Sequence, residues 1–117
     1  MERSSLLVRD EMRERRRFFR YAVAWPVRLW LNEHVMLRGQ TVDASVKGLR
    51  IVLDAPPPEG LKVGERYRVE VMPERGDRFA CFAEVRHIGK AGIGLENLVE
   101  VPLSLILRDA TSRPDEV

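Results

Sequence analysis

The sequence has one cysteine and no apolar run long enough to cross a bilayer. Cys81 has no second cysteine to pair with, which excludes an internal disulfide, and no cluster of metal-ligand residues surrounds it. Apolar stretches such as 35–37 and 103–107 fall far short of the roughly 20 residues that a membrane-spanning helix needs. The stretch 4–8 is too short for the core of a signal peptide, and acidic residues follow it. These absences predict a cytoplasmic protein with no membrane insertion.

Lysine is also scarce. Three of the 20 basic residues are lysine, which leaves 17 arginines, and the formal net charge is only +2. So small a net charge argues against a general polyanion binder that works by bulk charge. Arginine, unlike lysine, offers a planar fork of donors that can grip a phosphate or the Hoogsteen edge of guanine. A GC-rich genome explains an overall arginine excess equally well, but it does not explain local clusters of arginine.

The chain lacks the signatures of common catalytic sites. It has no G-x-x-x-x-G-K, no G-x-S-x-G, no H-E-x-x-H and no C-x-x-C. His34 and His87 stand apart, without partners at metal-ligand spacing, and we expect both at the surface. Nothing in the pattern supplies Ser45 with a base or an oxyanion hole. We therefore expect a protein that is not an enzyme and that uses neither a metal nor a cofactor.

The length of 117 residues suits a single domain, and 44% hydrophobic residues are enough for one core. Residues 1–14 are polar and lack the wide apolar stripe of a helix that docks on a core, so they predict a flexible N-terminal arm. We expect the domain itself to span 15–109, with 110–117 as a C-terminal tail.

Within that domain the apolar pattern consists of short segments of strand character separated by tight turns. The expected strands are 22–31, 35–42, 49–53, 67–72, 79–88 and 93–96. Pro26, inside the first of them, predicts an edge position or a bulge. The run 101–108, with Pro102 near its start, predicts a short C-terminal helix. Six short, closely spaced strands favour an antiparallel barrel or sandwich, and of the two we expect an all-β fold with a six-stranded antiparallel β-barrel.

The densest arginine cluster, at 15–20, reads Arg-Arg-Arg-Phe-Phe-Arg and lies where the arm meets the first expected strand. In most proteins such a run is a solvated basic linker. Phe18 and Phe19 argue against that interpretation, because two large apolar side chains should dock the segment against something. Arg16 and Arg20 are also spaced so that both can reach one compact anion with two phosphates.

A second segment, 43–48, reads Asp-Ala-Ser-Val-Lys-Gly and lies between the second and third expected strands. Taken alone it is an ordinary turn, since Asp and Ser bond to nearby backbone and Gly relaxes the backbone restrictions. Asp43 can equally accept the N1 and N2 protons of a guanine, and Ser45 can add a further hydrogen bond. Gly48 permits the close approach of a planar base to the backbone.

Together the two segments resemble the PilZ domain family, in which R-x-x-x-R enters the first strand and D-x-S-x-x-G separates the second from the third. The matching residues here are Arg16 and Arg20, then Asp43, Ser45 and Gly48. The resemblance extends over roughly 15–107. It implies a barrel that binds the bacterial second messenger cyclic di-GMP and passes the signal on by changing shape.

The resemblance also implies a role for each residue. It assigns an arginine clamp for guanine edges and phosphates, a pair that reads a guanine's Watson–Crick edge, and a glycine that leaves room for the ligand: Arg16 and Arg20, Asp43 and Ser45, and Gly48. Arg15 resembles the extra arginine of family members that bind an intercalated ligand dimer. Arg50 and Arg86, on the third and fifth expected strands, are weaker candidates. Where Asn97 stands, the family usually has a large apolar residue, a departure that concerns packing.

Two alternatives stay open. A small β-barrel with an arginine-rich arm can bind single-stranded nucleic acid, but the low net charge and the lack of a row of exposed aromatic residues in the pattern argue against it. A PilZ-like adaptor can act by protein contacts without ligand, although such adaptors typically lack the motif arginines. A domain of this size carries no output module, so we expect an unidentified protein partner in either case, and no nucleic acid.

Overall fold

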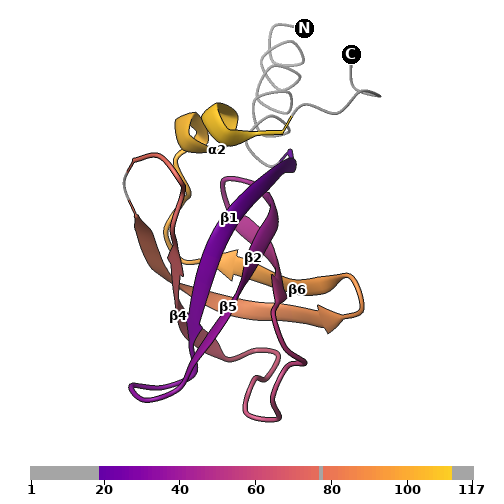
Figure 1. Ribbon diagram of the computed structural model, residues 1–117. Helices are drawn as coiled ribbons and strands as arrows, with labels where there is room; N and C mark the ends of the chain where they lie inside the picture. The colour runs from indigo at the N-terminus through magenta and orange to yellow at the C-terminus, as the bar shows by residue number, and fades with distance from the viewer. Residues whose placement is uncertain (1–18, 77, 112–117) are drawn as a thin grey trace, which may run out of the picture.

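The computed structural model describes residues 19–76 and 78–111. Six strands and one helix follow one another along this part of the chain: β1 (Tyr21–Trp30), β2 (Met36–Ala44), β3 (Gly48–Leu53), β4 (Arg66–Val71), β5 (Phe79–Gly89), β6 (Gly92–Asn97) and α2 (Leu103–Asp109). The strands close into a barrel in the order β1-β2-β3-β6-β5-β4, and every neighbouring pair is antiparallel (Figure 1). The expected six-stranded antiparallel β-barrel with a short C-terminal helix is confirmed.

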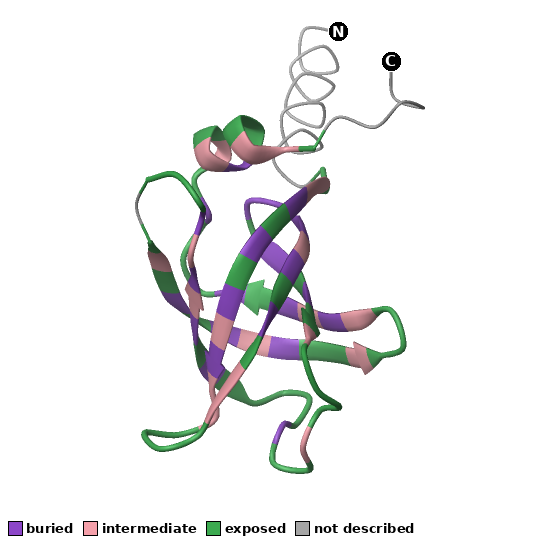
Figure 2. Ribbon diagram, in the orientation of Figure 1, coloured by how far each residue is buried: buried purple, intermediate pink, exposed green. Residues whose placement is uncertain are grey.

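The barrel forms because apolar residues recur at every second position of its strands, and successive strand residues point to opposite faces. In β1, Val27 and Leu29 are buried while the intervening Arg28 is half-buried, and in β4 Tyr67 is buried between Arg66 and Arg68, which are exposed. Figure 2 shows the resulting alternation of buried and exposed residues along β1. Full burial of such a side chain contributes about 1.5–3 kcal/mol, so the aligned apolar positions supply the main driving force for closure.

Helix α2 lies beyond the end of the barrel at which β1 begins (Figure 1). Its Ile106 is fully buried in the core, and the buried indole of Trp25 donates from Nε1 to Oδ2 of Asp109 at 2.8 Å. The backbone N–H of Thr111 then donates to the carbonyl of Ala22 at 2.8 Å. The C-terminal segment is thereby tied to the first strand as far as the described residues extend.

Register shifts interrupt three of the ladders, between Ala22 and Trp25 of β1, between Thr41 and Asp43 of β2, and between Val85 and His87 of β5. The shift in β1 immediately precedes Pro26, in agreement with the bulge expected there. An extra residue in one strand exchanges the faces to which its side chains point.

Several boundaries differ from those expected. The segment 43–48 is not a turn throughout, because β2 continues to Ala44 and β3 begins at Gly48, so that Ser45–Lys47 alone connect them. The reason is that Asp43 pairs with Arg50 across the two strands, which extends the ladder through a residue type that usually ends strands. His34 and His87 are both exposed, as expected. Within the described residues, no helix is both long and apolar enough to cross a membrane.

Candidate functional site

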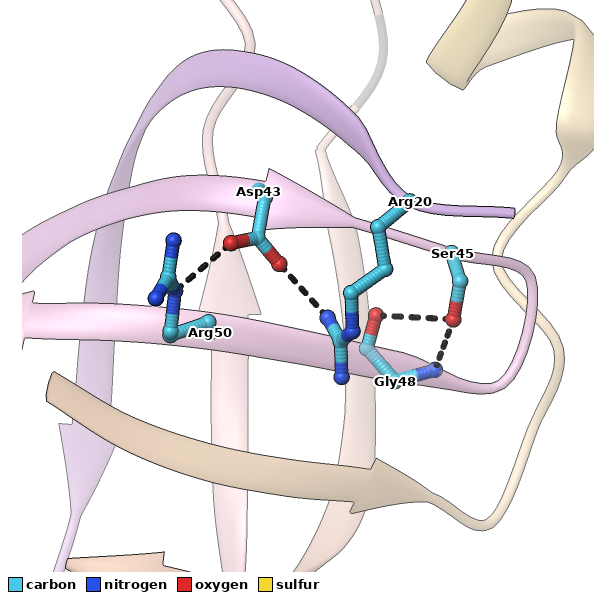
Figure 3. Close-up of polar contacts among 5 residues, drawn as sticks. All are labelled: Arg20, Asp43, Ser45, Gly48 and Arg50. Atoms are coloured by element: carbon cyan, nitrogen blue, oxygen red, sulfur yellow. Dashed lines mark hydrogen bonds and ion pairs between the residues drawn. The ribbon is translucent and has the colours of Figure 1, made fainter. Parts of the chain in front are cut away.

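Asp43 lies between two arginines on the outer face of the barrel (Figure 3). Arg20 donates from Nη1 to Oδ1 of Asp43 at 2.6 Å, and Nε of Arg50 lies 2.6 Å from the other carboxylate oxygen, Oδ2. The side chain of Asp43 is only 10% exposed, whereas those of Arg20 and Arg50 are 49% and 44% exposed. The three residues therefore form a charged row in which the carboxylate is covered and both guanidinium groups still face solvent.

The register shift in β2 is what turns Asp43 outward. Thr41 pairs with Ile51, and both are fully buried in the core. In a regular strand Asp43 would point to the same face as Thr41, because side chains two residues apart share a face. Val42 is the extra residue of the bulge, so Asp43 pairs with the outward-facing Arg50 instead. Bulges commonly re-aim a side chain next to a functional site.

Ser45 organises the turn that follows. Its backbone N–H donates to the carbonyl of Gly48 at 2.8 Å, and its Oγ accepts from the N–H of Gly48 at 3.1 Å. The turn is fastened to the far end of β6, since Val46 and Lys47 accept from the N–H groups of Val101 and Asn97, each at 2.8 Å. Ser45 is 6% exposed, so its hydroxyl already performs the local structural role expected of a turn serine.

Gly48 stands where no larger residue fits. A Cβ at this position would lie 2.8 Å from the carbonyl oxygen of Leu95 and 3.4 Å from Nη2 of Arg20. The first contact is with backbone of the neighbouring strand and cannot relax easily, and the second shows that the Arg20 side chain reaches over Gly48 (Figure 3). Glycine is thus required here by the barrel itself, before any ligand is considered.

The surface next to this row is bare backbone. Arg50 pairs across β3 and β6 with Gly94, and Gly92 lies two residues earlier on the same face of β6. A Cβ at Gly92 would lie 2.5 Å from the carbonyl oxygen of Ile51. The φ of Gly92 is +123°, a backbone angle that residues with a side chain rarely adopt. The glycines leave a strip without side chains of its own beside the two arginines.

The structure brings together four of the six predicted site residues: Arg20, Asp43, Ser45 and Gly48. Arg15 and Arg16 lie outside the described residues. Arg50, a weaker candidate in the sequence, makes direct contact with Asp43. The sequence signal for Arg50 was its place two residues after Gly48 in an alternating strand, but the contact itself depends on the bulge in β2.

Arg86 is not part of the charged row. It is paired with Glu84 at 2.7 Å and with Glu96 at 3.4 Å, and the hydrogen bond to Glu84 together with the charges of both glutamates raises the pKa of Arg86. Glu96 lies opposite Gly48 in the β3–β6 ladder. The acidic residues of β5 and β6 therefore hold Arg86 beside the site rather than in it.

Comparison with known proteins identifies the class of protein to which this fold and charged row correspond. The model of the PilZ domain family matches residues 14–108, and the chain therefore belongs to the PilZ domain family. No curated protein matches the sequence.

Several solved structures resemble the fold, among them the following two. One is the PilZ domain with c-di-GMP of YcgR from Escherichia coli, with a TM-score of 0.63 and 23% identity over 80% of this chain and 87% of that one. The other is the Bacillus subtilis inhibitor of motility, MotI/DgrA, with a TM-score of 0.60 and 21% identity, where the match covers 80% of this chain and 48% of that chain. At these identities the likeness supports the barrel fold.

Proposed function

We propose that this chain is a receptor for cyclic di-GMP that binds the ligand without chemical change, on the outer face of β2 and β3. The observation that carries the proposal is the placement of Asp43 between two half-exposed arginines beside a glycine strip, with Arg20 and Asp43 at positions that match the PilZ motifs. The structure of YcgR in complex with c-di-GMP supports the choice of ligand for a domain of this fold.

The chemistry of the row suits this ligand. Cyclic di-GMP presents two guanines and two phosphates, and forked guanidinium donors can bind either a phosphate or the Hoogsteen edge of guanine. A carboxylate can accept two hydrogen bonds from the N1 and N2 groups of a guanine. We assign the first role to Arg20 and the second to Asp43.

Arg50 competes with the ligand for the carboxylate of Asp43, and we expect it to contact the ligand once that ion pair is broken. Both oxygens of Asp43 are engaged by arginine, so a guanine that reads the carboxylate with two hydrogen bonds has to replace at least one of those contacts. The displaced guanidinium remains within reach of the same ligand, because both arginines are nearly half exposed. Arg50 thus exchanges an internal ion pair for one with the ligand, at little net cost in electrostatic free energy.

The remaining predicted contacts complete the proposal. Arg15 and Arg16 would approach from the segment that precedes Arg20, with Arg16 completing the clamp and Arg15 serving an intercalated ligand dimer. Ser45 would contribute through its hydroxyl in addition to its bonds within the turn, and Gly48 would keep the surface low. We take 15–109 as the functional unit, with 1–14 as the N-terminal arm and 110–117 as the C-terminal tail.

Transmission to a protein partner would run through the 45–47 turn. That turn is bonded to Asn97 and Val101, which flank the segment that leads into α2. A ligand that pulls on Asp43 or Ser45 therefore acts on the same short stretch of backbone that positions the helix. The partner would sense the resulting change at this end of the barrel.

Isothermal titration calorimetry with cyclic di-GMP tests the proposal, with GTP and GMP as controls. We expect saturable binding of cyclic di-GMP and at least about tenfold weaker binding of both mononucleotides, because neither can occupy the whole set of charge-assisted contacts. Equal affinity for GMP, or no binding of cyclic di-GMP, would contradict the assignment. If cyclic di-GMP did not bind at all, the alternative of an adaptor that acts by protein contacts alone would be favoured.

A further inference from the structure

The outer surface of β2, β1, β4 and β5 carries a row of large side chains that the proposed function does not use. Trp30 of β1 pairs with Met36 of β2 on one side and with Arg68 of β4 on the other, and Arg68 pairs in turn with Phe82 of β5. These residues face outward, since their strand neighbours Leu29, Val69 and Ala83 are fully buried. We call this surface the aromatic–arginine face.

The face is apolar and hollowed. Phe82 is 56% exposed, and the adjoining Leu98, whose N–H donates to the carbonyl of Phe82 at 2.9 Å, is 51% exposed. A hollow of about 490 Å³ is lined by three aromatic residues, Trp30, Tyr67 and Phe82, by Arg66 and Arg68, and by the segment 31–33, which includes Glu33. A hollow of this size accommodates one or two apolar side chains of a partner.

Three arginines of the face form no ion pair with any residue that the structure describes. Arg28 lies directly opposite Arg38 in the β1–β2 ladder, and within the described residues neither of them, nor Arg68, forms an ion pair. Like charges placed opposite one another across strands destabilise a sheet. The repulsion between Arg28 and Arg38 lowers the stability of the free protein. An anionic partner would relieve this repulsion, and the relief would contribute to the free energy of binding.

Two of the acidic residues nearby, Glu70 and Glu84, already have partners. Glu70 accepts a hydrogen bond from the indole N–H of Trp30, and Glu84 is paired with Arg86 at 2.7 Å and with Arg66 at 3.7 Å. The indole is held by Glu70 against the strands. The face therefore offers pre-oriented aromatic surface together with Arg28, Arg38 and Arg68, which form no ion pair with a described residue although Glu33 and Glu70 lie on the same face.

We propose that the aromatic–arginine face docks an acidic segment of a partner protein that carries a large apolar anchor residue. The composition supports a protein partner, because protein interfaces are enriched in aromatic residues, Met and Arg and depleted of Lys, and no lysine lies on these four strands. The complementary charge selects an acidic segment.

Single-stranded nucleic acid is the main rival, since aromatic residues and arginines also bind bases and phosphates. Glu70 argues against it. Its carboxylate lies in the middle of the face, where it would repel a backbone that carries a phosphate at every nucleotide. A peptide can place its acidic residues over the arginines and an apolar residue elsewhere.

The face is separate from the proposed cyclic di-GMP site. The charged row occupies β2 and β3 near the 45–47 turn, whereas Met36 and Arg38 lie at the opposite end of β2. The two sites share one strand and no residue. The chain can therefore hold ligand on one side and its partner on another.

The test uses the full chain and a fluorescein-labelled acidic peptide with interspersed Leu and one Trp. The comparison probes are a peptide with Lys in place of each acidic residue, one with Ser in place of each apolar residue, and an oligothymidylate. Binding is followed by fluorescence anisotropy and mapped by amide chemical shifts. We expect the acidic apolar peptide to bind at least about tenfold more tightly than any of the three, with shifts confined to β1, β4, β5 and the end of β2 that holds Met36 and Arg38.

Two variants localise the interaction. Arg68→Glu should weaken peptide binding at least about tenfold and Phe82→Ser about fivefold, as is typical for a charged and an apolar anchor. The matched controls are Lys90→Glu and Val52→Ser, which change exposed residues of the same kinds outside the face. Equal effects from the controls, shifts centred on Arg50, or tighter binding of the oligothymidylate would each overturn the proposal.

The experiment is independent of the proposed function. Cyclic di-GMP affinity should be unchanged in Arg68→Glu and Phe82→Ser, and peptide binding should survive Arg20→Ala. A chain that failed to bind cyclic di-GMP but bound the peptide as described would refute the receptor proposal and leave this one intact.

Discussion

The two outer faces of the barrel handle their arginines in opposite ways. On the ligand face, which we define as Arg20, Asp43, Arg50 and the adjoining Gly48 and Gly94, both arginines are bound to one carboxylate at 2.6 Å. On the aromatic–arginine face, Arg28 and Arg38 face each other, and neither forms an ion pair with a described carboxylate, although Glu70 lies opposite Arg28 in the β1–β4 ladder.

The difference indicates two kinds of recognition. A carboxylate that holds two arginines in place pre-orients their donors, which suits a small ligand with fixed positions for phosphate and base. Unpaired arginines among exposed aromatic residues present adaptable charge on an apolar surface, which suits a macromolecule that buries a larger area. One barrel can carry both recognition surfaces because the ligand face lies on β2 and β3, whereas most of the aromatic–arginine face lies on β1, β4 and β5.

The largest expected effect is that of Arg20→Ala on cyclic di-GMP affinity. A charge-assisted hydrogen bond is worth about 1.5–3 kcal/mol, so we expect a loss of about tenfold to a hundredfold in calorimetric affinity. Arg16→Ala, in the other half of the motif, should act in the same direction. Because Arg20 is half exposed, the fold should survive its loss.

Arg68→Ala on the aromatic–arginine face is the matched control for this variant. It removes an exposed arginine from a strand of the same barrel without touching Asp43. If both variants lowered the affinity equally, the ligand would be held by general charge and the distinction between the faces would fail.

The next largest effect is expected for Gly48→Ala. The added Cβ would meet the Leu95 carbonyl oxygen at 2.8 Å and crowd Arg20 at 3.4 Å. Forced overpacking costs about 1–3 kcal/mol, so we expect a lower melting temperature and, from the displaced arginine, an affinity lowered about tenfold. Thermal unfolding and calorimetry measure the two effects separately.

Gly60→Ala controls for the loss of a glycine as such. Its added Cβ would find its nearest neighbour, Cδ1 of Leu31, at an ordinary 3.8 Å. This variant should bind with unchanged affinity. An unaltered affinity in Gly48→Ala as well would show that the position of the Arg20 side chain over Gly48 does not matter for binding.

Arg50→Gln should have a smaller effect, a loss of about threefold to tenfold in affinity. Removing the arginine frees Oδ2 of Asp43 for the ligand, which helps binding, but it also removes a positive charge from the path of two phosphates, which opposes it. We expect the charge to dominate, and the loss to shrink as salt is added. An affinity that rises in this variant would identify Arg50 as a competitor only.

The ligand face also shows how much of the fold and of the site the sequence alone can predict. Alternation of apolar residues predicted the six strands and the barrel, because burial has the period of the strand. It could not predict that Asp43 faces outward, since Thr41 is buried two residues earlier and only the bulge at Val42 reverses the face. The contact between Asp43 and Arg50 follows from that bulge and was therefore out of reach.

The aromatic–arginine face shows the same limit. No row of exposed aromatic residues is visible along any one strand, because Trp30, Arg68 and Phe82 belong to three strands and are aligned only by register. Pairing between strands depends on the closed barrel and not on local sequence. The motif residues were accessible to sequence reasoning because their order along the chain carries the family pattern.

Asn97 stands where the PilZ family usually has a large apolar residue. We expect a substitution there to change the stability of the barrel without affecting binding at either face. Asn97 is 7% exposed, and within the described part of the chain neither its Oδ1 nor its Nδ2 has a hydrogen-bond partner. An unsatisfied buried polar group costs about 1–3 kcal/mol, so Asn97→Leu, a change to an apolar residue of similar size, should raise the free energy of unfolding by an amount of that order. Urea denaturation measures it.

Asn97→Ala serves as the comparison for that substitution, because it also removes the amide but leaves a cavity. It should be less stable than Asn97→Leu. If Asn97→Leu were instead destabilised, the amide would have partners in solution, and the 45–47 turn, to which the Asn97 N–H is bonded, would depend on them.

The smallest expected effect is that of the face variants on the reactivity of the buried Cys81 thiol. This reactivity shows whether a substitution on either face disturbs the barrel interior. The Cys81 side chain points into the barrel from β5, and burial raises the pKa of the Cys81 thiol to about 11. At pH 8 only about one thiol in a thousand would then be ionised, so a thiol reagent should react slowly, with a rate that rises about tenfold per pH unit.

Arg20→Ala and Arg68→Glu should both leave this rate within about twofold of the original protein, because neither residue packs against the core and local opening governs the access of the reagent. Rapid labelling of Arg20→Ala at pH 8 would mean that the barrel had opened, and its loss of cyclic di-GMP affinity would then report damage to the fold. Slow labelling in both variants, together with selective loss of ligand in one and of peptide in the other, is the result that would establish two independent faces on a single intact barrel.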